Sequence, residues 1–502
     1  MDAYTHATLT EAAQRLETGE WTSAGVCRAC LERIRELDRE GPALRAVIEL
    51  NPDAMAAAAA RDEAFARGEA RGPLHGVPVL IKDSIDTADR TQTTGGSLAM
   101  EGNFAPEDAA VVARLRAAGA VILGKTNMSE WGYLRSSRPC SGWSSRGGQT
   151  RNPYVLDRTP CGSSSGSAAA VAAHYVPLAL GAEVDGSVVH PSSMNSLVGL
   201  KPTVGLVSRR GVMGIARQQD TAGTMTRTVA DAALALNVLA GEDPGDPATA
   251  ASQGHVPADY RGFLEAGRLE GVRLGVARAY FGFHEGTDAV VNHALGVLRG
   301  LGAELVELPD FDPVPFFGEQ EMILFKYGLK ASLNAYLASH PKAPVRTMEE
   351  LIEANRAQAG RILPFFGQEV FEEAVKLGDL DTPEHREAEA ACRRMAREEG
   401  LDPALREHRL DAIVAPTDGT PPYAIDPVIG DNLHGGCSSV AAMAGYPHLT
   451  VPAGYVHGEL PVGLSLIGGD WQEPKLLRLG HAFETAHPVR HAPTFLSTIP
   501  LA

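Results

Sequence analysis

The 502-residue sequence predicts an α/β fold, in which one large domain is built on a mixed, largely parallel β-sheet with helices on both faces. Two observations lead to this prediction. Residues 77–81 and 120–123 are continuous apolar runs, which are typical of strands buried on both faces. Residues 106–118, which lie between them, have the length and composition of a helix. Strand, helix and strand at this spacing indicate parallel strands joined by a crossover.

The N-terminal residues 1–70 predict a helical region that precedes the core of the domain. Thr8 and Glu11 have the spacing of a capping box, which opens a helix. The next apolar side chains recur at helical spacing and include Cys27 and Cys30. These two cysteines have the CxxC spacing of a redox pair, but no strand precedes them, so we expect them to be core residues.

The rest of the chain continues the alternation of strands and helices. The expected strands are 46–50, 272–277, 304–308, 411–416, 448–452 and 462–467, and the expected helices are 52–68, 228–239 and 288–301. We assign residues 71–240 to the core of the domain. Residues 316–408 are mostly helical in pattern with long charged faces, which predicts a helical insertion over the active site.

The composition is that of an ordinary globular protein, with 44% hydrophobic and 21% charged residues. A formal net charge of −17 would repel nucleic acids and anionic membranes. The sequence shows no signal peptide and no apolar run long enough to span a membrane, and six scattered cysteines fit a reducing compartment. We therefore expect a soluble cytoplasmic protein, monomeric or homodimeric, that binds neither nucleic acid nor membrane.

Residues 161–191 concentrate the residue types that nucleophilic catalysis needs. Two small-residue turns, 162–167 and 185–187, flank an apolar run. Small residues let backbone N–H groups approach a substrate, and a serine hydroxyl beside them could attack it. Upstream, Lys82 ends an apolar strand, where a lysine is costly to bury. Gly/Ser clusters are also ordinary loops, so the turns alone leave both interpretations open.

Two shorter motifs match other active sites but lack the structural context of those sites. Residues 119–126 match the phosphate-binding P-loop pattern, yet the middle of the match is apolar and strand-like. Residues 162–166 match the G-x-S-x-G nucleophile elbow with Ser164 at its centre, but no strand precedes them. An α/β-hydrolase that uses Ser164 stays as an alternative hypothesis.

The two serine turns and the lysine segment together resemble the amidase signature family. The resemblance rests on residues 76–83, 162–167 and 185–187, and on further segments at 124–127, 199–205 and 461–464. It implies the amidase signature fold and a Ser–Ser–Lys triad, with Ser187 as nucleophile, Ser163 as proton relay after a cis peptide bond, and Lys82 as base. The sequence has no HExxH segment and no paired-cysteine site with metal-ligand spacing, so we expect neither a metal nor a cofactor. The oxyanion would be held by the N–H groups of Val184, Asp185, Gly186 and Ser187.

A lysine can act as a base only when its amine is neutral. An ordinary lysine has a pKa of about 10.4, so work near neutral pH needs a decrease of roughly three units, and burial at the end of an apolar strand would supply it. Attack of the serine on an amide carbonyl would then give an acyl-enzyme, which water hydrolyses.

Details of the sequence resemble the bacterial peptide amidase branch of the family, which removes ammonia from C-terminal peptide amides. Residues 46–52, 147–154 and 219–223 carry this likeness. Val189 stands where an arginine is common in the family. We expect a primary amide on a peptide-like or arylalkyl acyl group, in a pocket lined by Trp131, Tyr133, Trp143, His190 and Phe316.

Two other functions stay open. The chain could be the amidase component of a glutamine-dependent tRNA amidotransferase that is active only with partner subunits, although the charge of −17 and the missing arginine argue against this role. It could also be a catalytically silent binding protein with the same fold, although all three triad residues are present.

Overall fold

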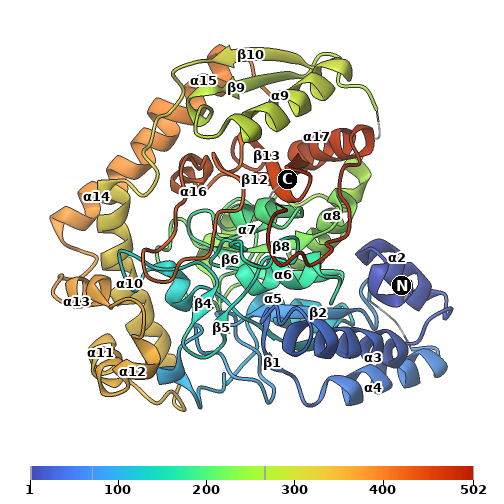
Figure 1. Ribbon diagram of the computed structural model, residues 1–502, viewed down its shortest axis with the longest axis vertical. Helices are drawn as coiled ribbons and strands as arrows, with labels where there is room; N and C mark the ends of the chain where they lie inside the picture. Colours follow the sequence, from blue (N-terminus) through green and yellow to red (C-terminus); the bar gives the residue numbers. More distant parts are fainter. Residues whose placement is uncertain (1–2, 70–71, 265–266, 501–502) are drawn as a thin grey trace.

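The computed structural model describes residues 3–69, 72–264 and 267–500. In this part of the chain, eleven strands form one sheet that extends through the molecule (Figure 1). The order of the strands is β1 (Val47–Leu50), β3 (Val121–Thr126), β2 (Pro78–Lys82), β6 (Leu178–Glu183), β8 (Thr221–Thr226), β7 (Val198–Lys201), β12 (His448–Val456), β13 (Leu460–Ile467), β11 (Ala412–Pro416), β9 (Arg273–Ala277) and β10 (Glu304–Leu308). Two short strands, β4 (Trp143–Ser144) and β5 (Gly148–Gln149), form a separate pair. The predicted α/β fold on a single mixed sheet is confirmed.

The parallel pairings of the sheet lie toward its two ends. β3, β2 and β6 run parallel to one another, and so do β11, β9 and β10. The edge strand β1 and the central strands pair antiparallel with their neighbours. Parallel neighbours bring their carboxyl ends to the same edge of a sheet. The residues that end β2 and those that follow β6 therefore lie close together.

Helices cover both faces of the sheet (Figure 1). In the described ranges they are α1 (Ala3–His6), α2 (Leu9–Glu17), α3 (Ser23–Ile34), α4 (Ala54–Ala66), α5 (Ala110–Ala117), α6 (Ser165–Ala172), α7 (Val189–Met194), α8 (Val229–Leu239), α9 (Glu285–Gly300), α10 (Glu319–Ser339), α11 (Met348–Ala357), α12 (Ala359–Ile362), α13 (Glu369–Ala374), α14 (Pro383–Arg393), α15 (Asp402–Glu407), α16 (Ser438–Ala444) and α17 (Glu473–Ala486). α6 packs against β6 and β2, and α7 packs against β7, β12 and β13. These two short helices flank the catalytic candidates.

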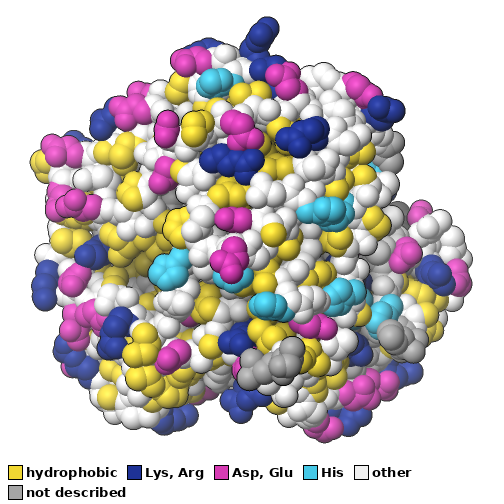
Figure 2. Space-filling model, turned by 45° about the horizontal axis from the view of Figure 1, so that its top comes forward, with side chains coloured by type: hydrophobic (Ala, Val, Ile, Leu, Met, Phe, Trp, Pro, Cys, Tyr) yellow, Lys and Arg dark blue, Asp and Glu magenta, His cyan; other side chains and the backbone are white. Residues whose placement is uncertain are grey.

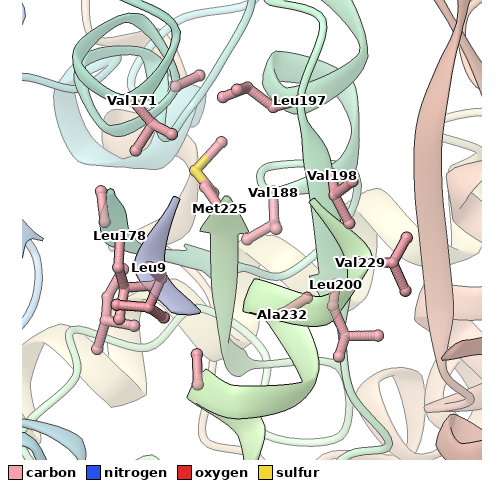
Figure 3. Close-up of a cluster of buried hydrophobic side chains, with 14 of the residues drawn as sticks. Leu9, Val171, Leu178, Val188, Leu197, Val198, Leu200, Met225, Val229 and Ala232 are labelled. Atoms are coloured by element: carbon pink, nitrogen blue, oxygen red, sulfur yellow. The ribbon is translucent and has the colours of Figure 1, made fainter. Parts of the chain in front are cut away.

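The main core lies where α6 and the central strands meet (Figure 3). Met225 of β8 lies among Val171 of α6, Leu178 of β6, Val198 of β7, and Val188, which precedes α7; all five side chains are fully buried. Each side chain of this size stabilises the fold by about 1.5–3 kcal/mol through burial. Segments that are far apart in the sequence are thereby fixed around β6.

The N-terminal helices begin as predicted. The Thr8 hydroxyl accepts from the N–H of Glu11 at 3.2 Å, and the Glu11 carboxylate accepts from the N–H of Thr8 at 2.8 Å, which confirms the capping box of α2. Cys27 and Cys30 are buried free thiols in α3, as expected for core residues. The predicted boundary between residues 1–70 and 71–240 falls on positions 70–71, which lie outside the described residues.

Between β10 and β11 the chain forms the helices α10 to α15, of which α10 to α14 lie on the left side of Figure 1 and α15 lies at the top. Apolar side chains of α10 to α13 build a second hydrophobic cluster, apart from the main core, that includes Leu324, Phe325, Leu333, Leu351 and Phe371. Trp131 and Val184 belong to the same cluster. The inserted helices therefore pack directly against the segment that follows β6.

The sequence patterns do not predict β6, β7 and β8, which are central in the sheet. The apolar run of residues 168–180 has the pattern of one buried element, but it contains most of α6 and the start of β6. Nearly every side chain there is buried, so neither the helical nor the strand periodicity is visible in the sequence. The P-loop match at residues 119–126 lies mostly in β3, which confirms that it is not a loop.

Candidate active site

Lys82, Ser163 and Ser187 form one continuous path of hydrogen bonds. Lys82 Nζ donates to Ser163 Oγ at 2.7 Å and to the carbonyl oxygen of Ala182 at 2.8 Å. Ser163 Oγ lies 3.0 Å from Ser187 Oγ. All three residues are buried. The fold thus brings together the three residues that the sequence motifs single out.

Three different elements position these side chains. Lys82 is the last residue of β2, Ser163 precedes α6, and Ser187 follows β6, the parallel neighbour of β2. The peptide bond between Gly162 and Ser163 is cis, as the family resemblance implies. A Cβ atom at Gly162 would lie 2.2 Å from Ser129 Oγ, so this close approach of the backbone requires a glycine.

The surroundings of Lys82 favour a neutral amine. Burial lowers the pKa of Lys82 from 10.5 to about 7, and the nearby carboxylate of Glu183 opposes this shift only in part. Removal from water always penalises the charged form of an ionisable group. About half of the molecules at pH 7 therefore hold an amine that can accept a proton.

The residues from Val184 to Ser187 form a tight turn after β6, which we call the oxyanion turn. Gly186 has a φ of +73°, a left-handed conformation that favours glycine. Within the described ranges, none of the four N–H groups donates a hydrogen bond. Backbone donors left without acceptors beside a serine hydroxyl have the arrangement that stabilises a developing oxyanion.

Side chains on both sides of the oxyanion turn hold it in place. Glu183 Oε2 accepts from the N–H of Val188 at 2.7 Å and from that of the next residue at 3.1 Å. Val188 points into the main core (Figure 3). Cβ atoms at Gly181 and Gly223 would lie 3.0 Å from a methyl group of Val188, so both glycines make room for it. The sequence does not predict the role of Glu183; its only signal is a carboxylate at the end of an apolar strand.

Two cavities meet at Ser163 and Ser187. The first also includes Lys82 and is otherwise mostly apolar, with Met128, Trp131, Val212, Met213, Ile215, Leu329 and Leu333. The second is lined by Tyr133, His190, Phe316, Phe317, Phe325 and Asp431. A mostly apolar cavity beside the two serine hydroxyls could receive an apolar acyl group.

The fold places the aromatic residues that were predicted to line one pocket in three different surroundings. Trp131 lines the first cavity, and Tyr133 and Phe316 line the second. Trp143 lines neither of them: its ring packs 5.1 Å from that of Phe366, in a separate small cluster. The expectation for Trp143 is corrected here, because a core aromatic and a pocket aromatic look alike in sequence.

Ser164, the centre of the nucleophile-elbow match, is not among the residues that line either cavity. Ser164 is fully buried, and its Oγ contacts the backbone carbonyl and N–H of Ala182, each at 3.3 Å. A residue held in this way has no path to a substrate. The alternative of an α/β-hydrolase using Ser164 is not supported.

Metal-binding and membrane-spanning features are absent from the described part of the chain. No group of three or more His, Cys, Asp or Glu side chains there has the geometry to hold a metal ion. No helix in the same ranges combines the length and apolar character that crossing a bilayer requires.

Comparison with known proteins identifies the family. The family model described as Amidase matches residues 25–477. The chain belongs to the amidase signature family. A solved peptide amidase in complex with the competitive inhibitor chymostatin is 47% identical to this amidase and superposes with a TM-score of 0.94, over 98% of this chain and 100% of that one.

Curated relatives extend over most of this amidase as well. A protein from Arabidopsis thaliana named "Probable amidase" is 40% identical, over 95% of this chain and 89% of the relative. A glutamyl-tRNA(Gln) amidotransferase subunit of Chloroflexus aurantiacus is 37% identical, over 95% of this chain and 96% of the relative. These matches show that the chain is an amide-hydrolysing enzyme.

Proposed function

We propose that this amidase releases ammonia from C-terminal amides of peptides and similar acyl groups, with Lys82, Ser163 and Ser187 as a Ser–Ser–Lys triad. The observation that carries the proposal is the hydrogen-bonded path from Lys82 Nζ to Ser187 Oγ, which ends beside the oxyanion turn. A base, a relay and a nucleophile within hydrogen-bond reach, next to backbone donors, are the parts that acyl transfer requires.

In the first half-reaction, Ser187 Oγ attacks the carbonyl carbon of the amide. Its proton passes to Ser163, and the Ser163 proton passes to the neutral amine of Lys82. Hydroxyl protons rotate, so the contacts of 2.7 and 3.0 Å serve transfer in either direction. The carbonyl oxygen becomes an oxyanion and accepts from N–H groups of the oxyanion turn, each worth about 10² to 10³ in rate.

The C–N bond then breaks. The Lys82 ammonium returns its proton through Ser163 to the leaving nitrogen, which departs as ammonia, and the acyl group remains on Ser187 as an ester. A water molecule attacks this ester while Lys82 takes up a proton from it through Ser163. The C–O bond to Ser187 then breaks, Lys82 returns the proton through Ser163 to Ser187 Oγ, and the carboxylic acid is released. These steps balance without a metal or a cofactor.

The lining of the two cavities supports a capped peptide C-terminus over a free carboxylate. Among the described lining residues, neither cavity includes an arginine, and Val189 occupies the position where the family commonly has one. The nearby Arg209 and Arg210 line an adjoining hollow and pair with Asp246 and Asp243. The apolar walls suit a peptide-like or arylalkyl acyl group, and the similarity to a peptide amidase supports the same substrate class.

A glutamine-dependent amidotransferase subunit is the second candidate, because of the 37% identity to the Chloroflexus protein. The net charge of −17 disfavours binding to tRNA. On the face shown in Figure 2, acidic and basic side chains are interspersed and do not gather into one basic patch. We therefore propose that this amidase acts without nucleic acid.

The test is ammonia release from a C-terminally amidated dipeptide, compared with release from free glutamine. Ser187→Ala serves as the blank. We expect a kcat/KM at least about tenfold higher for the dipeptide amide, since one unpaired charge in an apolar pocket costs more than about 1.4 kcal/mol. A preference for glutamine, or activity that depends on a co-purifying subunit, would favour the amidotransferase function.

A further inference from the structure

His190 lies beneath the oxyanion turn, with both ring nitrogens held by buried partners. Nδ1 lies 2.5 Å from Asp418 Oδ1, and Nε2 lies 2.8 Å from Ser438 Oγ. His190 is 2% exposed, Asp418 3% and Ser438 0%. The edge of the ring reaches the second cavity, but its polar atoms are directed into the protein. The ring is therefore fixed in orientation.

Ser438 connects this ring to the oxyanion turn. Ser438 Oγ donates to Asp185 Oδ1 at 2.5 Å, and Ser439 Oγ donates to Asp185 Oδ2 at 2.6 Å. Both serines begin α16, and Asp185 is the second residue of the oxyanion turn. The carboxylate of Asp185 thus ties the turn to α16, while its N–H has no acceptor among the described residues.

The backbone of the oxyanion turn also rests on the ring itself. A Cβ atom at Gly186 would lie 2.0 Å from His190 Cδ2 and 3.0 Å from Ser438 Oγ. The N–H of His190 donates to the carbonyl oxygen of Gly186 at 2.9 Å. Any shift of the ring would therefore move the peptide groups on either side of Gly186.

The hydrogen-bond partners of the ring favour one protonation state. A hydroxyl has one proton to donate, and Ser438 donates it to Asp185. The contact between Ser438 Oγ and His190 Nε2 then needs a proton on the nitrogen. Nδ1 faces a carboxylate oxygen of Asp418, which is an acceptor, so that nitrogen carries a proton as well. A ring with both protons is an imidazolium.

The charged groups around the ring agree with this state. Burial by itself would lower the pKa of His190, but the carboxylate of Asp418, with those of Asp185 and Glu183, raises it above the ordinary value. His448 on β12 is a nearby group that could bring an opposing positive charge. Burial lowers the pKa of His448 well below its ordinary value, so that side chain is neutral.

We propose that His190 is a positioning residue for amide hydrolysis: held as an imidazolium between Asp418 and Ser438, it fixes the oxyanion turn. This inference rests on the proposed function, because the turn matters only if an amide carbonyl docks there. The N–H groups of the turn interact most strongly with the oxyanion of the transition state. Loss of their alignment therefore lowers kcat more than it raises KM.

The test compares His190→Leu, His190→Gln, Asp418→Asn and Ser438→Ala in the intact enzyme, with Ser192→Ala as the matched control. Ser192 is buried on the same helix α7, and its hydroxyl has no partner among the described residues. We expect kcat for an amidated dipeptide to fall about 10- to 100-fold in His190→Leu, Asp418→Asn and Ser438→Ala. His190→Gln keeps an N–H donor toward Ser438 and should recover part of kcat. Ser192→Ala should match the wild type.

Two further measurements separate positioning from a general loss of packing. Affinity for a peptide aldehyde, which forms a tetrahedral adduct with a serine, should fall in parallel with kcat, while KM stays within about threefold. Nitrogen-15 NMR of the histidine rings should show two protonated nitrogens for the signal that His190→Gln removes. A signal with one unprotonated nitrogen would overturn the imidazolium.

An active enzyme whose His190→Leu and Asp418→Asn variants keep the wild-type kcat would overturn the positioning role. Equal losses in Ser192→Ala would do the same, since they would indicate a general disturbance of α7. A wild-type protein that hydrolyses no amide would contradict the proposed function instead. The NMR measurement would still decide the protonation of His190 in that case.

Discussion

In the proposed mechanism, the pKa of Lys82 sets the lower pH limit at which this amidase can work. Burial lowers that pKa from 10.5 to about 7. At about 1.36 kcal/mol for each pH unit between these values, removal from water disfavours the ammonium by about 5 kcal/mol. About half of the Lys82 amines are then neutral at pH 7 and about one in a hundred at pH 5. An ordinary lysine would be neutral in only about one molecule in 3,000 at pH 7.

The assay is kcat/KM for an amidated dipeptide between pH 5 and pH 9, which reports the pKa values of the free enzyme. We expect the rate to fall about tenfold per pH unit below pH 7 and to level off above it. Circular dichroism over the same range controls for unfolding. A rate that still rises steadily up to pH 9, or one that is flat between pH 5 and pH 8, would refute the assignment of a neutral Lys82 as the base.

The same pKa shift predicts an effect on stability. In the unfolded chain Lys82 is charged below pH 10.5, and in the folded enzyme it is neutral above about pH 7. Between these values the unfolded state holds the extra proton, so the stability contributed by this group rises with pH. Below pH 7 the full destabilisation of up to about 5 kcal/mol is present.

The variant Lys82→Met, which the proposed mechanism predicts to be inactive, removes this cost. It also loses two hydrogen bonds worth about 1 kcal/mol each. Its melting temperature should therefore exceed that of the wild type at pH 7, by a margin that disappears toward pH 10. A variant that is less stable than the wild type at pH 7 would contradict the calculated cost of burial.

Three other predictions follow from the placement of the site residues. Ser187→Ala should lower kcat/KM at least about 10³-fold. Ser164→Ala should keep most activity, because the hydroxyl of Ser164 contacts the backbone of Ala182. The reverse pattern would favour the nucleophile elbow. Trp143→Ala should destabilise the fold by about 3–5 kcal/mol without changing KM, because its ring packs in a separate cluster. Phe316→Ala should raise KM with little loss of stability, because Phe316 lines the second cavity. A raised KM in Trp143→Ala would indicate that Trp143 contacts the substrate. EDTA or phenanthroline should leave ammonia release unchanged, and a loss that added zinc restores would reveal a metal site.

The triad residues of the site could be predicted because each of them lies in a short, recognisable segment of the sequence. Lys82 ends an apolar strand, and Ser163 and Ser187 lie in small-residue turns, so each is visible in a few consecutive residues. Asp418 and Ser438 reach the oxyanion turn only through the pairing of β11 and the packing of α16. No local pattern marks either residue, since the contacts join positions more than 200 residues apart.

Prediction of the fold from local sequence has the same limit, and the central strands of the sheet are an example. β2 and β3 are short apolar runs bounded by turns, and a predicted helix separates them, so their type is readable from sequence. β6 follows α6 after a few residues, and both elements are buried on all sides. Alternation of polar and apolar residues vanishes when both faces are covered, and only the partner strands decide which element forms.

The measurement that tests the central claim most directly is the position of a covalent adduct. A fluorophosphonate that reacts with activated serines would be incubated with the enzyme, and the modified residue would be located by mass spectrometry of its peptides. We expect a single adduct on Ser187, formed much more slowly in Lys82→Met. An adduct on Ser163 or Ser164, with Ser187 unmodified, would contradict the assignment of Ser187 as the nucleophile.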